Sequence, residues 1–166
     1  MISNILKEFS KGIDLIEQIS NEDYTKEING ASLGAHFRHC IDFAYNLLKG
    51  LESGEINYNN RERDIGIEVN KEHAKERLLF LSESLKTISV ESFSDKVLSS
   101  SEIEDKLWLE STIARELEFL HSHTVHHYAI INEKLKSAGI KVKYGFGVAP
   151  STLKYWAENK TQSKLA

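Results

Sequence analysis

The hydrophobic residues of the chain repeat at three- and four-residue steps over four long stretches, the spacing that lines one face of an α-helix. This pattern predicts helices at about residues 2–20, from Leu33 to near Gly54, at 71–89, and from about 107 to 137. Ser32 is placed to cap the second of these helices. Four amphipathic helices of comparable length predict an all-α fold, a four-helix bundle, in which sites lie between facing helices.

The segments between these helices have a different composition. Residues 55–69 are polar and aperiodic, which predicts a long connection between the second and third helices. The serine-rich stretch after the third helix permits a short strand pair around Phe93–Leu98 and Ile103–Leu109. Gly139 suits the end of the fourth helix, and Ser151 suits the cap of a short C-terminal helix through Trp156.

Composition narrows the class of protein. A length of 166 residues predicts one domain, 1–166, and 40% apolar with 28% charged residues is a globular balance. A formal charge of -4 and the lack of a long apolar run argue against nucleic-acid and membrane partners. The single cysteine, Cys40, and an N-terminus unlike a signal peptide predict a reducing, cytoplasmic location.

The histidines are the strongest chemical feature, because four of the seven fall between His121 and His127. At about 100° per residue, His127 and His123 lie about 20° and about 60° to one side of the buried residue Leu120. Two inward histidines four residues apart are typical of helical zinc sites, although a hydrogen-bonded core pair has the same pattern. His121 and His126 fall about 100° and about 120° away from Leu120, which predicts that they face solvent or a partner.

A third ligand would have to come from the second helix, which offers His36 and His39. Relative to Phe37, His36 lies inside the apolar arc at about -100°, whereas His39 lies just beyond its edge at about -160°. Periodicity therefore favours His36, although a ligand on the flank of a helix can still reach a site between helices. His73, among charged residues at the start of the third helix, is expected to be solvated.

Two segments carry a family resemblance. Residues 32–42, Ser-Leu-Gly-Ala-His-Phe-Arg-His-Cys-Ile-Asp, and residues 116–129, Glu-Leu-Glu-Phe-Leu-His-Ser-His-Thr-Val-His-His-Tyr-Ala, resemble the motifs of the DinB/YfiT-like superfamily of metal-dependent enzymes. The resemblance implies a four-helix bundle with a three-histidine metal site. It also implies that His39, seven residues after Ser32, and His123 and His127 are the ligands, with His36 as the rival of His39.

Three imidazoles on a divalent ion would leave a coordination position for water or substrate, and this donor set suits zinc or nickel better than magnesium or calcium. The resemblance implies a hydrolase or a thiol-dependent transferase acting on a small molecule. Glu116 is a candidate general base or imidazole acceptor, and Asp42 is a second candidate acceptor, although both also suit structural roles.

The polar connection adds three candidates for catalysis, Tyr58, Arg61 and Arg63, which with Glu68 resemble a pattern in one branch of the same superfamily. If this loop covers the site, an arginine could hold an anionic substrate group, whereas the alternative is a solvated loop with internal ion pairs.

A different class of function is also consistent with the sequence. The chain would then be a catalytically silent metal- or ligand-binding helical bundle that serves in sensing or subunit association. Tyr128, His126 and Phe119, predicted on the outer sides of the last long helix, would supply the surface of a homodimer.

Overall fold

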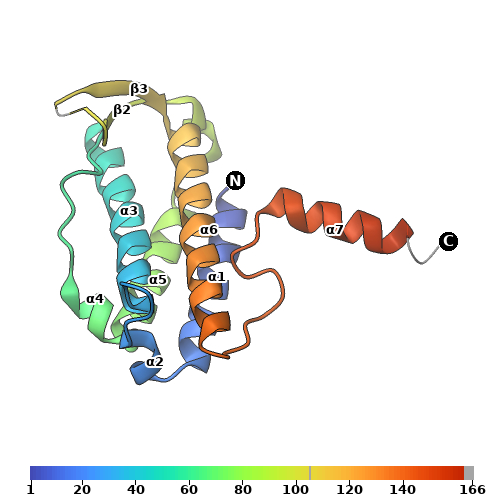
Figure 1. Cartoon of the computed structure of the whole chain (residues 1–166). Coiled ribbons are helices and arrows are strands. Elements are labelled where there is room, and N and C mark those ends of the chain that lie inside the picture. The colour runs from blue at the N-terminus through green and yellow to red at the C-terminus, as the bar shows by residue number, and fades with distance from the viewer. Residues whose placement is uncertain (105, 163–166) are drawn as a thin grey trace.

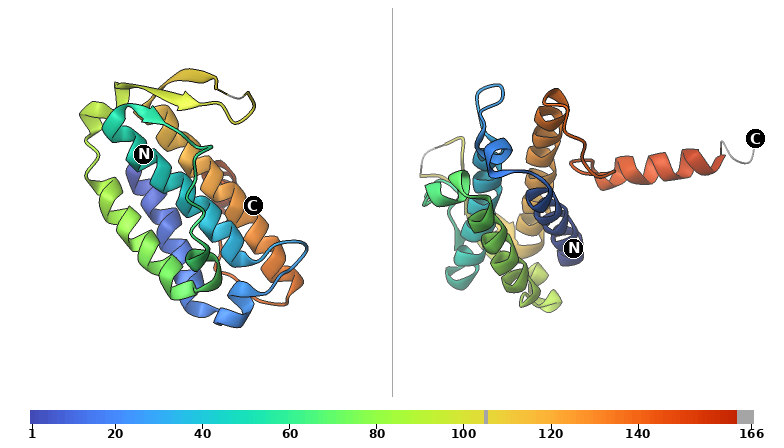
Figure 2. Two further views of the ribbon diagram at one scale, coloured as in Figure 1. Left: turned by 90° about the vertical axis from the view of Figure 1, so that its left-hand side faces the viewer. Right: turned by 90° about the horizontal axis from the view of Figure 1, so that it is seen from below.

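The computed structural model describes residues 1–104 and 106–162, and the chain is mostly helical (Figure 1). The long helices of its body are α1 (Ile2–Gln18), α3 (Leu33–Ser53), α5 (Lys71–Lys86) and α6 (Ile113–Ser137). Helix α1 packs against α5 and α6, and α3 packs against the same two helices. Helices α1 and α6 run in one direction, and α3 and α5 run in the other (Figures 1 and 2). The hydrophobic faces predicted from the sequence meet in the core between them.

Local chemistry fixes the ends of the helices that carry the site. The Ser32 hydroxyl accepts a hydrogen bond of 3.0 Å from the backbone N–H of Ala35, so the predicted cap of α3 is confirmed. At the other end of α3, Gly54 has a φ of 78°, a left-handed conformation that glycine adopts without steric cost. Gly139 has a φ of 74° directly after the last turn of α6, as the sequence predicted.

A small sheet at one end of the molecule shows that the fold is not purely α-helical. The strands β1 (Glu55–Ile56), β2 (Lys96–Ser100) and β3 (Trp108–Thr112) lie in the order β1-β2-β3 within the described residues. Strand β1 is parallel to β2, and β2 is antiparallel to β3. The prediction of a strand pair in this region is confirmed, and its boundaries shift towards the C-terminus.

Strand β3 also corrects the start of the last long helix. Residues 108–112 pair with β2, and the Thr112 hydroxyl then accepts from the backbone N–H of Arg115, so α6 begins at Ile113 and not near Leu107. Over five residues the apolar spacing of a strand and that of a helix are hard to tell apart.

Short helices interrupt the connections. They are α2 (Asn21–Thr25), α4 (Ile65–Val69) and the 3-10 helix η1 (Val90–Ser94). The predicted long connection thus contains β1 and α4, and α4 packs against α3. Elements of five residues are too short for hydrophobic periodicity to reveal.

The C-terminal helix α7 (Pro150–Gln162) extends away from the other helices (Figure 1). It begins at Pro150 and continues beyond Trp156, so Ser151 lies within the helix and does not cap it. Proline suits the first turn of a helix, where its missing N–H has no intrahelical partner. Trp156 on this helix and Trp108 on β3 are both partly exposed.

Tyr128 on α6 is fully buried, which corrects its predicted place on an outer, dimer-forming surface. Its ring points into a notch at Gly12 on α1, where a Cβ atom would collide with the tyrosine hydroxyl. The ring also stacks on Phe146, with centroids 4.7 Å apart. Helix α6 is therefore buried on the side that faces α1 as well as on the side that faces α3.

No helix among the described residues combines the length and the apolar character that crossing a lipid bilayer requires.

Candidate metal centre

Three histidines from two helices converge between α3 and α6. One ring nitrogen from each of His39, His123 and His127 lies within 4.8 Å of the corresponding nitrogens of the other two. The ring centroids are 4.9 Å apart for His39 and His123, 4.5 Å for His39 and His127, and 4.7 Å for His123 and His127. Each side chain is partly buried. The structure thus brings together the three residues that the sequence analysis named as metal ligands.

His36, the rival of His39, lies next to this cluster and contacts one member. Its Nδ1 atom is 3.1 Å from Nδ1 of His127, and its Nε2 atom is buried without a partner in the described structure. A hydrogen bond at Nδ1 orients an imidazole and leaves Nε2 for another ligand, as in many metal sites. His36 therefore fits the role of a positioning residue for His127.

Aromatic rings form one wall of the cluster. Phe43, four residues after His39 on α3, stacks on His123 with centroids 4.0 Å apart, and Tyr58 stacks on Phe43 at 5.0 Å. Phe119 contacts the His123 ring at 5.6 Å. The sequence analysis did not assign Phe43 to the site, although its spacing of four from His39 places both on one side of the helix. These rings exclude water from one side of His123 and fix its orientation.

Partial burial keeps the three imidazoles neutral. Burial lowers the pKa of His39 and of His123 to about 4 and that of His127 to about 3. Neighbouring histidines add to this effect for all three rings, and Arg61 adds to it for His39 and His123. A neutral imidazole is the form that binds a metal, so the rings are already in that form at neutral pH.

The residues fit a divalent ion that prefers nitrogen ligands. Nε2 of His123 is buried and has no hydrogen-bond partner in the described structure, although an unpaired buried nitrogen is costly. A metal ion at the centre of the three rings would accept such a lone pair. The donor set contains no carboxylate, which suits zinc-like ions better than magnesium or calcium.

The segment between β1 and α4 covers one side of the cluster. Arg61 lies over the ring of Phe43 at 5.2 Å, and its Nη1 atom is 2.7 Å from Nδ1 of His39. Arg63 is exposed, and its φ of 53° is in the left-handed region. Of the two arginines predicted in this loop, Arg61 is the one that contacts the histidines.

Glu116 serves a structural role, because its carboxylate is hydrogen-bonded outside the histidine cluster. Its carboxylate is buried and accepts hydrogen bonds from the Tyr58 hydroxyl at 2.9 Å and from the Ser111 hydroxyl at 2.5 Å. Both oxygens thus have partners outside the cluster. The pair joins the covering loop and β3 to α6, and burial together with Glu116 raises the pKa of Tyr58 above its usual value.

Asp42 also belongs to an ion-pair network. It is buried and pairs with Arg38 at 3.3 Å, and Arg38 also pairs with Glu68 of α4 at 2.9 Å. Burial raises the pKa of Asp42, and Arg38 opposes that rise. The network ties α4 to α3, and the Nδ1 partner of His39 is Arg61 rather than Asp42.

The three histidines outside the cluster and its neighbour His36 differ in their exposure to solvent. His126 is exposed, as predicted, but His121 is 9% exposed and therefore buried, so its predicted outward position is wrong. His121 lies seven residues, about two turns, before Tyr128 and so on the same side of α6, the side that meets Gly12 of α1. His73 is partly exposed, and its Nε2 atom is 3.4 Å from Asp64, so it is held beside a carboxylate and is only in part solvated.

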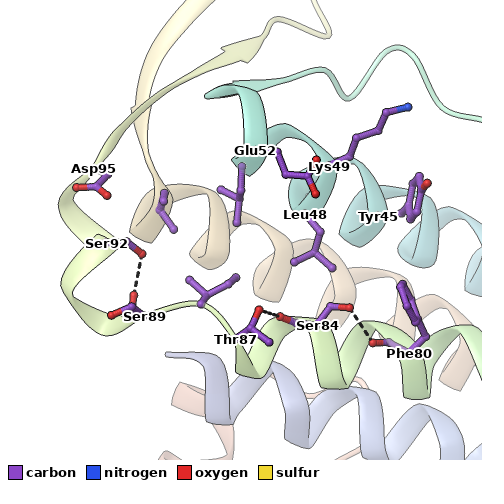
Figure 3. A pocket seen from close by; sticks show the side chains of 13 residues that line it. Tyr45, Leu48, Lys49, Glu52, Phe80, Ser84, Thr87, Ser89, Ser92 and Asp95 are labelled. Atoms are coloured by element: carbon purple, nitrogen blue, oxygen red, sulfur yellow. Dashed lines mark hydrogen bonds between the residues drawn. The ribbon is translucent and has the colours of Figure 1, made fainter.

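A large groove lies elsewhere, between the C-terminal halves of α3 and α5 and the 3-10 helix η1 (Figure 3). Its volume is about 870 Å³. The hydroxyls of Ser84, Thr87 and Ser92 donate to backbone carbonyls there, so they are already paired. These hydroxyls of the groove are paired within the protein, whereas the three histidines converge with ring nitrogens that can bind a metal. The histidine cluster, and not this groove, is therefore the candidate site.

The arrangement of the elements matches a solved structure. A DinB-like protein of Bacillus subtilis, YjoA, superposes with a TM-score of 0.64 over 87% of this chain and 96% of that one. The chain has a DinB-like fold. Sequence identity is 15%, so the likeness concerns the fold. The DinB-like fold was the expectation from the motifs at residues 32–42 and 116–129, and it is confirmed.

Comparison of the sequence with known families and proteins gives less information than the DinB-like fold does. No protein-family model matches the chain. FK506-binding protein 5 of Rhizopus delemar is 32% identical over 104 residues, which is 60% of this chain. That region is 27% of the fungal protein, so the chain spans about a quarter of the length of this relative.

Proposed function

We propose that the chain is a single-domain, metal-dependent enzyme that acts on a small molecule, as a hydrolase or a thiol-dependent transferase. The observation that carries the proposal is the convergence of the ring nitrogens of His39, His123 and His127 within 4.8 Å. Its support is the DinB-like fold, in which the cluster lies between the facing helices α3 and α6.

A zinc or nickel ion held by three neutral imidazoles would supply Lewis acidity and lower the pKa of a bound water or thiol. The chain's own residues prepare that chemistry. His36 orients His127, and the stack of Phe43 and Tyr58 holds His123 and keeps water from one side. Arg61 places a cation next to the cluster, where it can hold an anionic group of a substrate.

A second candidate function is a silent metal- or ligand-binding domain within a larger assembly. The observation that favours it is the match to a region that is 27% of FK506-binding protein 5, because the similar segment there is part of a longer protein. Such a domain would bind its ligand without turnover. Its partners would include a second copy of the chain or a neighbouring domain.

The first experiment is metal analysis of protein purified without a histidine tag. We expect about one equivalent of zinc or nickel, or uptake of one equivalent on addition. Alanine at His39, His123 or His127 should remove it. Alanine at His126, which is exposed on the same helix, is the matched control and should retain it. Less than about a tenth of an equivalent, unrestored by added metal, would overturn the proposal.

The second experiment separates the enzyme from the silent domain. Metal-loaded protein is screened with esters, amides and thiol adducts, and the His123→Ala protein serves as the blank. Turnover that depends on His123 supports the enzyme. Metal binding without turnover on any of these substrates favours the silent domain.

A further inference from the structure

The contact between Arg61 and His39 carries a chemical restriction. The guanidinium of arginine is always protonated and only donates hydrogen bonds. With Nη1 of Arg61 2.7 Å from Nδ1 of His39, that imidazole nitrogen must be the acceptor. A neutral imidazole has one donor and one acceptor nitrogen, so the proton of His39 then lies on Nε2.

In this arrangement neither nitrogen of His39 has a free lone pair. A metal that binds Nδ1 must displace the guanidinium directly. A metal that binds Nε2 requires the proton to move to Nδ1, where it would face the N–H of Arg61 and break the hydrogen bond. Both routes separate Arg61 from His39 when the third ligand is used.

We propose that Arg61 and the metal ion compete for His39, so that Arg61 is released into the site when the ion binds. The inference rests on the proposed metal site and concerns its regulation. Nε of Arg61 is buried without a partner in the described structure, so the guanidinium keeps hydrogen-bonding capacity even in its present place. The loop itself stays anchored, because Tyr58 is held by Glu116.

The released guanidinium would stay beside the ion. Tyr58 is only three residues away along the chain and fixes the start of the segment, and Phe43 offers its ring face to Arg61. Metal binding would therefore convert an arginine that blocks a ligand into an arginine available to an anionic group. Metal occupancy and anion binding would be coupled through one side chain.

The test is the zinc affinity of the full chain, measured by competition with a chromophoric chelator. Arg61→Ala should bind zinc about tenfold more tightly than the wild type, because no hydrogen bond to a charged donor has to be broken. Arg61→Lys keeps a charged donor and should stay close to the wild type. Arg63→Ala removes the same charge from an exposed position of the same loop and should change affinity little.

Equal affinities for Arg61→Ala and the wild type would overturn the inference while leaving the metal site intact. No zinc or nickel binding by any of these proteins would overturn both.

A spectroscopic readout is independent of metal affinity. Nitrogen-15 spectra of the histidines in metal-free protein should show His39 with its proton on Nε2, and Arg61→Ala should shift it towards a mixture of tautomers. His39→Ala identifies the signal. A wild-type His39 that carries its proton on Nδ1 would contradict the proposal, because that nitrogen would then be unable to accept from Arg61.

Discussion

The carboxylate of Glu116 on α6 and the histidine cluster between α3 and α6 differ in how their polar atoms are paired. Both oxygens of the buried Glu116 carboxylate accept hydrogen bonds, from Tyr58 and Ser111. In the histidine cluster, by contrast, Nε2 of His36 and Nε2 of His123 are buried without partners in the described structure. A saturated polar group stabilises the fold, whereas an unsaturated one costs stability unless a ligand, an ion or water pairs with it.

The largest expected effect is the change that metal causes in the free energy of unfolding, which should depend on the histidine cluster and not on Glu116. Zinc or nickel at about a hundred times its dissociation constant should stabilise the wild type by about 2.7 kcal/mol, because it binds only the folded state. His123→Ala should lose this gain, and Glu116→Ala should keep it. Chemical unfolding with and without metal measures both. A metal-dependent gain that survives in His123→Ala would contradict the assignment of His123 as a ligand.

The second effect concerns Glu116 without metal. Glu116→Ala should lower the free energy of unfolding by about 2 kcal/mol, because the hydroxyls of Tyr58 and Ser111 lose their acceptor. Urea unfolding measures the change. Glu118→Ala, at an exposed position of the same helix, is the control and should cost little. Equal losses in the two variants would show that the buried pair has no special role.

A smaller effect should follow from His36. His36→Ala should weaken zinc binding about tenfold while keeping one equivalent, because His127 loses the partner at Nδ1 that orients its ring. His36→Asn, which keeps a polar group nearby, should recover part of the loss. Complete loss of metal from His36→Ala would instead make His36 a direct ligand.

The most gradual effect is the pH dependence of the metal-free protein. The pKa values of His39 and His123 are lowered from 6.5 to about 4 in the folded chain, so below 6.5 the unfolded chain binds more protons. Stability present above pH 6.5 should therefore fall as the pH drops towards about 4. Urea midpoints across this range measure it, and His123→Gln should give a flatter profile. A profile with no decline would contradict the lowered pKa values.

Much of the helical part of the fold could be predicted because periodicity is a strong signal over sixteen or more residues. Helices α1, α3, α5 and α6 were each predicted from their apolar stripes. Helices α2 and α4 were missed since five residues complete little more than one turn. The sheet was only partly predicted, because its pairing joins β1 to a strand forty residues away.

The parts of the site that lie on one helix could be predicted from the sequence, whereas those that depend on contacts between helices were harder to predict. His123 and His127 share one helix, so angular placement alone turned them inward. Periodicity favoured His36 over His39, and the family resemblance favoured His39, which the structure places in the cluster. His121 and Tyr128 were placed outside because α6 was treated as having one buried side, whereas it packs against both α1 and α3.

The positions of the two tryptophans decide which optical signal reports on which part of the molecule. Trp108 lies on β3 and Trp156 on α7, and each is more than a third exposed. Tyr24, Tyr58 and Tyr128, in contrast, lie inside the helical body with at most 2% exposure. Tryptophan emission therefore follows the sheet and the projecting helix, and the near-ultraviolet circular dichroism of the tyrosines follows the packed interior around the histidines.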